Sequence, residues 1–439
     1  MSIQETLQKI IKQVKAGIHP SDLLELIDDL NDQQRKELFE LLSDEEAALI
    51  IQEMEEFDQV SLLRLLTKHK ASAILKEMAI DDAADLLREL SPEEVKELLS
   101  LIEEEAEEIR GLLKYPEDSA GGIMTTDFIA LSEDITVEEA IIRLREVAPE
   151  AEIIYYVYVI DSQTKLSGVL SLRDLIAAED GTYLREIMYR NVISATAQMD
   201  QEEVARIVAR YDLLAVPVVD EEQRLLGIIT VDDIIDVIEE EATEDIYRLA
   251  GTSEVEGVNI LEASVTNIAS KRLPWLLLSL LGGLLSGSVI GAFEATLEFI
   301  VVLAVFIPVI MGMGGNVGTQ ASTLFVRGLA TGEIEKRDVW RYLLRELKVG
   351  LAMGIVNGAI VAAATLLWQG RPILGLVVGI AMFITITFAT LIGTLVPMFF
   401  NYYGVDPAIS AGPFVTTIND FTGLLIYFYT VSFFIKYLV

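Results

Sequence analysis

Two carboxylates near the C-terminus bracket the start of the last long apolar segment of the chain. Asp406 and Asp420 lie in the stretch DPAISAGPFVTTIND, which leads directly into GLLIYFYTVSFFIKYLV. Asp420 therefore falls inside a run that is otherwise typical of a membrane-spanning helix. A carboxylate is costly in hydrocarbon and usually faces a bundle interior or a water-filled path. We interpret Asp420 as lining a cation pathway, in preference to a residue that only hydrogen-bonds a neighbouring helix.

Acidic side chains also recur at helical spacing in the first 270 residues. Acids three or four residues apart share one face of a helix, where like charges repel. A solvated acidic surface is the ordinary explanation of one such face. Because several recur, we favour a divalent cation that bridges them, and hard oxygen ligands suit Mg²⁺ or Ca²⁺. The faces are Asp81 with Asp85, Glu202 with Asp212, Asp233 with Asp236, and Glu241 with Glu244 and Asp245.

The charge of the chain is divided unevenly. The 439 residues carry a net charge of −36, yet residues 271–439 hold 8 acidic and 10 basic side chains. The preceding 270 residues therefore hold 61 acidic and 23 basic side chains. Such a surface attracts cations and repels nucleic acid, which we exclude as a partner. The sequence has no cysteine, so disulfides and thiolate metal sites are excluded as well.

Residues 1–118 predict an acidic, all-α, superhelical N-terminal domain. Leucine and isoleucine recur at helical spacing, and Ser43 and Ser91 each precede acidic residues as at the start of a helix. Repeated short helices of this kind predict stacked hairpins. The start MSIQETLQKIIKQVKAG lacks the features of a signal peptide, so we expect the N-terminal domains to be cytoplasmic.

An internal repeat follows at a constant offset of 59 residues. Its copies contain YYVYVIDSQTKLSGVLSLRDLI and LLAVPVVDEEQRLLGIITVDDII, and each predicts strand, turn, strand and helix after an amphipathic helix. The pattern resembles a tandem pair of α/β CBS domains, here at residues 119–183 and 184–240. Such pairs often bind adenine nucleotides, so ATP is a candidate ligand, although fold alone does not identify one.

Five apolar segments follow a predicted connecting helix at residues 241–270, within a transmembrane pore domain at residues 271–439. Each is long enough to cross a hydrocarbon core of ~30 Å. The basic side chains gather between the second and third segments, which places the N-terminal region in the cytoplasm of a multi-pass cell-membrane protein surrounded by lipid. The segments are Leu273–Phe293, Phe299–Phe325, Val349–Trp368, Ile373–Phe400 and Ala411–Ile435.

Glycines mark two of these segments. In the first, Gly283, Gly287 and Gly291 predict a small-residue packing face. In the second, Pro308 is followed by VIMGMGGNVGTQAS, which is too polar for a helix that faces lipid. We expect Pro308 to kink this helix and the segment to line a pore; a packing interface is the alternative.

The order of these parts and two motifs resemble the MgtE family of magnesium channels. The motifs are Pro308 with GGNVGTQ, and DPAISAGPFVTTIND from Asp406 to Asp420. The resemblance covers essentially the whole chain. It implies a homodimer with its pore along the two-fold axis and a cytosolic gate that closes when magnesium is plentiful.

The resemblance also implies the residues that bind magnesium. Asp420 matches the pore carboxylate of the family, and Asp406 matches a second acidic site near the cytoplasmic mouth. Gly121 and Ala209 would each supply a backbone oxygen. Gly412 departs from the pattern, because a relative can carry a polar residue there. The implied ligands are Asp420, Asp406, Asp81, Asp85, Gly121, Glu202, Ala209, Asp212, Asp233, Asp236, Glu241, Glu244 and Asp245.

We therefore predict a Mg²⁺-selective channel that admits magnesium down its electrochemical gradient and is shut by cytosolic Mg²⁺ bridging the acidic faces. One alternative is an ion-coupled secondary transporter of divalent cations, with Asp420 as the coupling site. Another is a membrane nucleotide sensor based on the CBS pair. We do not expect an enzyme, because the two histidines lie in the N-terminal domain and the sequence has no Walker A or nucleophile-elbow motif.

Overall fold

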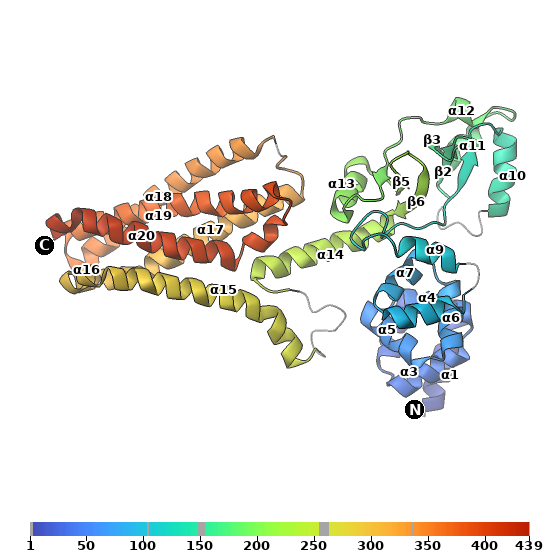
Figure 1. The fold of residues 1–439 in the computed structure, drawn as a ribbon, viewed down its shortest axis with the longest axis horizontal. Coiled ribbons are helices and arrows are strands. Elements are labelled where there is room, and N and C mark those ends of the chain that lie inside the picture. The colour runs from blue at the N-terminus through green and yellow to red at the C-terminus, as the bar shows by residue number, and fades with distance from the viewer. Residues whose placement is uncertain (1–2, 103–104, 148–153, 254–262, 336, 439) are drawn as a thin grey trace. The chain divides into compact units, whose positions relative to one another are not determined.

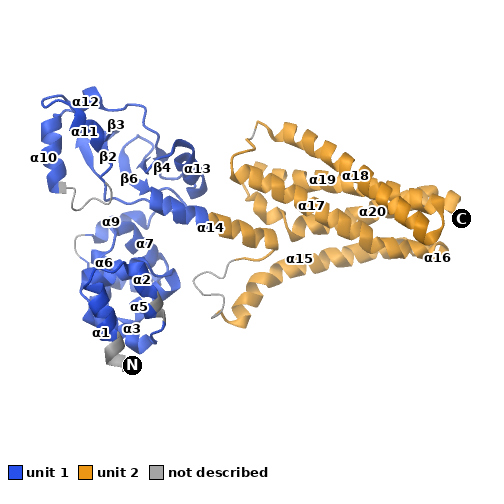
Figure 2. Cartoon of the chain, turned by 180° about the vertical axis from the view of Figure 1, so that it is seen from behind, with its two compact units in different colours: residues 1–239 blue, residues 240–439 orange. Residues whose placement is uncertain are grey.

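The computed structural model describes residues 3–102, 105–147, 154–253, 263–335 and 337–438 (Figure 1). The chain forms two compact units, residues 1–239 and 240–439 (Figure 2). Helix α14 (Val231–Ala250) begins in the first unit and ends in the second. The predicted fold class is confirmed in both units: a helical N-terminal domain, a CBS pair with small mixed sheets, a long helix, and apolar helices of membrane-spanning length.

The N-terminal domain is built from short helices in two rows. Alternate helices pack on one another, so α2, α4, α6 and α8 form one row and α1, α3, α5, α7 and α9 form the other. This is the stacking that the repeated leucine pattern predicts. The helices are α1 (Ile3–Val14), α2 (Pro20–Asp28), α3 (Asp32–Leu41), α4 (Asp44–Gln52), α5 (Glu56–Leu65), α6 (Lys68–Glu77), α7 (Ile80–Arg88), α8 (Pro92–Leu99) and α9 (Ala106–Leu112).

Capping residues set where these helices begin. The hydroxyls of Ser43 and Ser91 each accept a hydrogen bond from the backbone N–H three residues later, and the carboxylates of Glu46 and Glu94 accept one from the serine N–H. These reciprocal bonds satisfy two backbone donors that a helix end leaves unpaired. The apolar residues that follow then turn inward, and Leu38, Ile50 and Ile74 are fully buried in one core.

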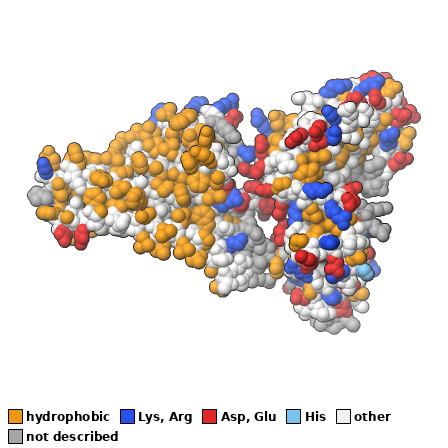
Figure 3. Space-filling model, viewed as in Figure 1, with side chains coloured by type: hydrophobic (Ala, Val, Ile, Leu, Met, Phe, Trp, Pro, Cys, Tyr) orange, Lys and Arg blue, Asp and Glu red, His pale blue; other side chains and the backbone are white. Residues whose placement is uncertain are grey.

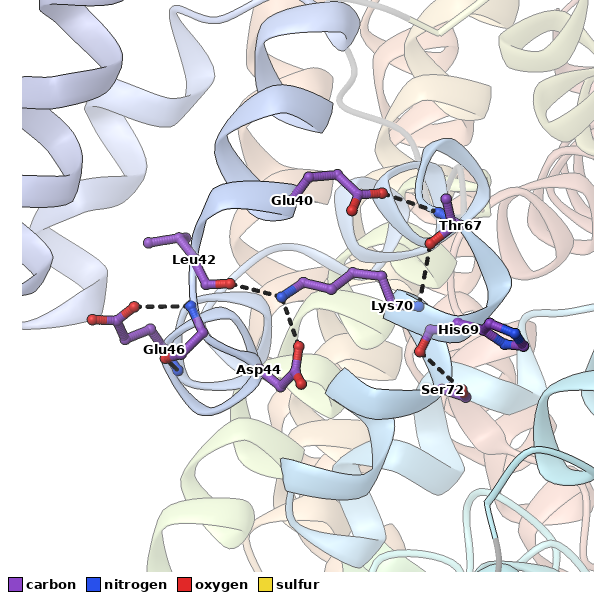
Figure 4. A network of polar contacts seen from close by, with 9 residues as sticks. Glu40, Leu42, Asp44, Glu46, Thr67, His69, Lys70 and Ser72 are labelled. Carbon is purple, nitrogen blue, oxygen red and sulfur yellow. Dashed lines mark hydrogen bonds and ion pairs between the residues drawn. The ribbon is translucent and has the colours of Figure 1, made fainter.

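A lysine ties two helices of this domain together. The Nζ of Lys70 on α6 donates to the carbonyl oxygen of Leu42 at 2.7 Å and to Oδ1 of Asp44 at 2.6 Å, as Figure 4 shows. Leu42 caps the C-terminus of α3, where carbonyl groups lack partners within the helix. The Lys70 side chain is only 12% exposed, so solvent replaces this bond poorly.

Replacing Lys70 with methionine should loosen the contact between α3, α4 and α6. Methionine keeps most of the apolar stem but leaves the Leu42 carbonyl and Asp44 without their donor, at a cost of about 1–2 kcal/mol. Hydrogen exchange on the full chain should show faster local opening of these helices. Lys68→Met is the matched control, because the Lys68 side chain is 63% exposed. Equal exchange in the two variants would contradict the assignment.

The two CBS copies have the same architecture. In the first, β1 (Ala130–Ser132) pairs in parallel with β2 (Tyr156–Ile160), which pairs antiparallel with β3 (Leu166–Ser171). In the second, β4 (Ala195–Thr196), β5 (Ala215–Val219) and β6 (Leu225–Thr230) repeat this order. A bridge between Lys165 and Arg224 joins the equivalent turns of the two copies. Their helices are α10 (Val137–Val147), α11 (Leu172–Ala177), α12 (Leu184–Ile187) and α13 (Gln201–Tyr211).

The second unit contains five candidate membrane spans among its described residues. Helices α17, α19 and α20 pack on one another, α18 packs on α19, and α15 packs on α20. Figure 3 shows hydrophobic side chains over most of the visible face of this unit, with charged side chains toward its ends. The elements are α15 (Val265–Ala292), α16 (Glu294–Phe299), η1 (Val301–Phe306), α17 (Ile307–Ala330), α18 (Val339–Gln369), α19 (Pro372–Tyr402), η2 (Pro407–Ser410) and α20 (Pro413–Leu438).

The expectation that Pro308 kinks a helix is wrong. Pro308 does not kink a helix, because it lies in the first turn of α17, where its missing N–H costs no hydrogen bond. The second span is instead divided into η1 and α17. Among the described residues, nothing lies within 4 Å of where a Cβ on Gly283, Gly287 or Gly291 would be, so their packing face stays a prediction. Gly282 beside them contacts Thr417 of α20.

Candidate functional site

Asp420 opens onto a cleft between four helices of the second unit. The cleft has a volume of about 340 Å³. Of the described residues that line it, only Asp420 is ionisable, and it comes from the second turn of α20. The six waters of a hydrated Mg²⁺ occupy roughly 180 Å³ at ~30 Å³ each, so the cleft has room for the ion with its waters. The lining residues are Leu249, Ala250, Ser279, Gly282, Gly283, Thr319, Gly412, Pro413, Thr416, Thr417 and Asp420.

Hydroxyl groups extend the polar surface beside Asp420. Thr416 lies one turn before Asp420 on α20, and its Oγ1 is 3.2 Å from Oγ1 of Thr319 on α17. Thr416 also donates to the carbonyl oxygen of Gly412 at 3.2 Å. The cleft therefore presents one carboxylate with hydroxyl and carbonyl oxygens, which are the hard ligands that Mg²⁺ or its bound waters accept.

Glycines of α17 let α20 come close enough to form this surface. A Cβ on Gly315 would lie 3.6 Å from Oδ1 of Asp420 and 3.2 Å from Thr416. A Cβ on Gly318 would overlap the side-chain amide of Asn419, which is buried beside α17. The glycine-rich run that the sequence shows in this span therefore serves close packing against the helix that carries Asp420.

A second acidic group lies where the end of α14 meets η2, within the same unit. Asp406 caps η2 by accepting a hydrogen bond from the backbone N–H of Ala408 at 2.8 Å, and it forms an ion pair with Arg248. Arg248 also pairs with Glu244 one turn earlier. Burial first, and then the neighbouring carboxylates of Asp406 and Glu241, together raise the pKa of Asp245 to about 6. The structure thus brings together the four predicted ligands Glu241, Glu244, Asp245 and Asp406.

A third acidic group forms inside the first unit, where α7 faces the first half of α14. Asp82 accepts a hydrogen bond from Nε2 of Gln52 at 2.5 Å. Burial raises the pKa of Asp82, and the carboxylates of Asp236, Glu53 and Asp232 raise it further. The pKa of Asp236 is also raised, by burial first and then by Glu239, Asp232 and Glu53. These carboxylates lie close enough to raise one another's pKa, and a cation-binding surface needs such a concentration of negative charge.

The other predicted residues of α7 and α14 have local structural partners. Asp85 accepts a hydrogen bond from Arg88 at 3.0 Å, and burial raises the pKa of Asp85 to about 7. Asp81 is buried in α7. Asp233 accepts hydrogen bonds from the N–H and hydroxyl of Thr230 and so caps α14. Burial raises the pKa of Asp233 to about 6.

Three further predicted ligands lie on or beside α13. Glu202 pairs with Arg206 at 3.4 Å, and Ala209 is exposed two turns later. Asp212 ends the helix in the left-handed conformation, with φ of 52°. Gly121 lies elsewhere in the first unit, where its N–H donates to the carbonyl oxygen of Ala197 at 2.9 Å. A side chain at Gly121 would overlap the ring of Tyr115.

Within the described ranges, no three His, Cys, Asp or Glu side chains come close enough to hold a metal ion by themselves. A divalent cation at any of these places would therefore keep part of its water shell. This fits Mg²⁺, which dehydrates reluctantly and is often bound by one or two carboxylates.

Sequence reasoning missed two residues of these groups, Asp82 and Arg248. Asp82 directly follows the predicted Asp81, and its neighbours Asp232 and Asp236 on α14 are distant in the sequence. Arg248 stands four residues after Glu244, a spacing at which a helix forms ion pairs, so this part of its role could have been read from the sequence.

Family comparisons match most of the chain. Residues 307–430 match the MgtE family, described as a divalent cation transporter. Residues 18–118 match the MgtE intracellular N domain, and residues 120–181 and 184–240 each match a CBS domain.

Curated relatives match over a large part of their length. The magnesium transporter MgtE of Thermus thermophilus is 42% identical over 97% of this chain and 96% of its own. The magnesium transporter MgtE of Bacillus subtilis is 43% identical over 75% of this chain and 73% of its own.

Two solved structures resemble the N-terminal half. The cytosolic domain of the Mg²⁺ channel MgtE in complex with ATP is 43% identical, with a TM-score of 0.51 over 54% of this chain and 98% of that one. The soluble part of a magnesium transporter is 38% identical, with a TM-score of 0.50 over 55% of this chain and 100% of that one.

Proposed function

Since this chain belongs to the MgtE family of magnesium transporters, we propose that it is a Mg²⁺-selective channel that admits magnesium into the cell and closes when cytosolic magnesium is high. The family consists of transporters and not of enzymes. The observation that carries the proposal is the cleft at Asp420, where a single carboxylate and several neutral oxygens face a space large enough for a hydrated ion.

The ion passes Asp420 with its waters largely in place. In this proposal two copies of the chain form a homodimer in the cell membrane, surrounded by lipid, and the two-fold axis brings two Asp420 side chains together. The paired carboxylates and the hydroxyls of Thr319 and Thr416 accept hydrogen bonds from the water shell. The membrane potential drives entry, because an inside-negative voltage favours each positive charge by ~2.3 kcal/mol per 100 mV.

The acidic groups supply the magnesium sensor. The pKa values of Asp82, Asp236 and Asp245 are raised partly by neighbouring carboxylates, so their charged forms repel. When cytosolic Mg²⁺ is scarce, this repulsion favours separation of the acidic faces and an open gate. When Mg²⁺ is plentiful, the ion bridges them, and the population shifts to a closed state that binds more Mg²⁺.

The sensor includes every implied ligand outside the membrane helices, each of them cytoplasmic in this proposal. Within the first unit these are Asp81, Asp85, Gly121, Glu202, Ala209, Asp212, Asp233 and Asp236. We add Asp82 to this proposal because the carboxylate of Asp236 raises its pKa. Within the second unit they are Glu241, Glu244, Asp245 and Asp406.

ATP is proposed as a second ligand, at the CBS pair. The support is a cytosolic domain 43% identical to this chain whose structure contains ATP. Equilibrium dialysis of the full protein with labelled ATP tests this directly. Binding that saturates at one nucleotide site per chain supports the assignment, and an absence of saturable binding removes it without affecting the transport proposal.

Purified protein in liposomes tests the transport proposal. Vesicles loaded with a fluorescent Mg²⁺ indicator should take up Mg²⁺ when a potassium diffusion potential makes the interior negative, in the absence of proton and sodium gradients. Flux that instead requires one of those gradients would favour the ion-coupled transporter. Vesicles that take up no Mg²⁺ under any gradient would contradict both transport mechanisms.

A further inference from the structure

The last turn of α14 is joined to the loop that carries Asp406 by a side-chain cation. Arg248 on α14 forms one ion pair with Asp406, from Nη1, and another with Glu244, from Nη2. The Arg248 side chain is 28% exposed, that of Asp406 is 29% exposed and that of Glu244 is 39% exposed, so the pair with Asp406 is the better shielded from solvent. A planar guanidinium is suited to two carboxylates at once, unlike the compact ammonium of lysine.

Apolar and backbone contacts complete the joint. Leu249 packs against a small buried cluster formed by Val326, Ala408 and Ala411. Gly412 is buried, and a Cβ there would overlap the carbonyl oxygen of Leu249. Gly251 has φ of +72°, which favours glycine, and a Cβ there would overlap the ring of Pro413. The end of α14 thus lies directly on the loop between η2 and α20.

The same end of α14 also borders the cleft at Asp420. Leu249 and Ala250 line the cleft together with Gly412 and Pro413. A displacement of this helix end would therefore remove part of the wall of the cleft. The contact that holds this helix end in place therefore helps to determine how accessible Asp420 is.

Charge explains why a cation is needed at the joint. Glu241, Glu244, Asp245 and Asp406 form the acidic group at this point, and Arg248 forms ion pairs with two of them, Glu244 and Asp406. In the proposed function a Mg²⁺ ion would bridge the same carboxylates. Arg248 therefore already binds two of the carboxylates that the ion would use, those of Glu244 and Asp406.

We propose that Arg248 is a tethered cation that holds the end of α14 on the Asp406–Pro413 loop without magnesium, and that it competes with divalent cations for Glu244 and Asp406. Gly412 and Gly251 provide the close backbone approach on which this contact depends. The inference rests on the proposed gating function for its significance, but the docking that it describes is measurable without transport. Arg248 is a positioning residue, since it acts on the cleft through the helix that bears it.

Disulfide formation between introduced cysteines tests the proposal in the full-length protein. The natural sequence has no cysteine, so only an introduced pair can react. Leu249→Cys with Ala411→Cys places one cysteine on α14 and the other in the cluster against which Leu249 packs. With a chelator present, this cysteine pair should form its disulfide rapidly. Adding Arg248→Gln should slow disulfide formation by roughly tenfold, which is the effect expected when hydrogen bonds between charged groups are lost. Mg²⁺ should then restore the rate, because it can replace the missing cation.

Two further variants separate electrostatic docking from general damage. Gly412→Ala should also slow the reaction, but Mg²⁺ should not restore the rate, because the obstacle is steric. Arg337→Gln is the matched control, since Arg337 is 78% exposed and pairs with Glu335. An Arg248→Gln rate equal to that of the parent pair would overturn the proposal, as would a slow rate that Mg²⁺ fails to restore. Failure of Mg²⁺ flux in liposomes would remove the proposed function and leave this result unaffected.

Discussion

Replacing Asp420 with asparagine should reduce Mg²⁺ flux by roughly tenfold or more, because a loss of even about 1.4 kcal/mol in ion binding lowers occupancy tenfold. Asparagine has nearly the same size, so the contact with Gly315 and Thr416 should persist. What is lost is the only ionisable group among the described residues of the cleft. Uptake of Mg²⁺ into liposomes under an inside-negative potential is the measurement.

The control for this variant is Asp338→Asn. Asp338 lies just before α18 and is 3.8 Å from Arg337, outside the cleft, so its flux should match that of the natural protein. Both variants should elute as folded protein in size-exclusion chromatography. Flux near the natural level in the Asp420 variant would contradict the assignment of the cleft as the ion path.

Neutralising Asp82 and Asp236 together should raise the Mg²⁺ concentration at which the channel closes. The charge of Asp236 raises the pKa of Asp82, and the charge of Asp82 raises the pKa of Asp85. A bridging cation would relieve this repulsion between carboxylates. Asparagine at both positions removes two negative charges, so Mg²⁺ binds this acidic group less tightly. We expect a shift of roughly tenfold in the half-closing concentration.

Liposome flux measured against a series of internal Mg²⁺ concentrations gives this shift. Asp134→Asn is the matched control, because Asp134 lies in the first CBS copy and pairs with Arg185, away from the acidic group. If the double variant and the control close at the same Mg²⁺ concentration, the acidic group between α7 and α14 has no part in sensing.

Most of the fold could be predicted because its patterns are repeated. The offset of 59 residues pairs Asp174 with Asp233. Each carboxylate caps the helix that follows its strand: Asp174 accepts a hydrogen bond from the N–H of Ser171, and Asp233 accepts one from the N–H of Thr230. Helix starts at Ser43 and Ser91 follow from local capping chemistry. Such features depend on neighbouring residues in sequence and are independent of how distant elements pack.

The errors arose where packing between distant elements decides the outcome. Pro308 is expected to kink the second span, yet the chain divides into η1 and α17 just before it. The carboxylate of Asp82 interacts with Asp232 and Asp236 of α14, more than 140 residues later in the sequence, so local spacing could not identify it. Arg248 reaches Asp406 across 158 residues of sequence, so no local pattern could reveal that pair.

Single-channel recording from the purified protein tests the central account most directly. With Mg²⁺ as the permeating ion and the cytoplasmic face perfused, raising Mg²⁺ on that face should lower the open probability while the current through each open channel persists. Asp420→Asn should lower the current by roughly tenfold or more at every Mg²⁺ concentration. An open probability that does not respond to cytoplasmic Mg²⁺, or unitary currents of undiminished size without Asp420, would contradict a channel that senses the ion it admits.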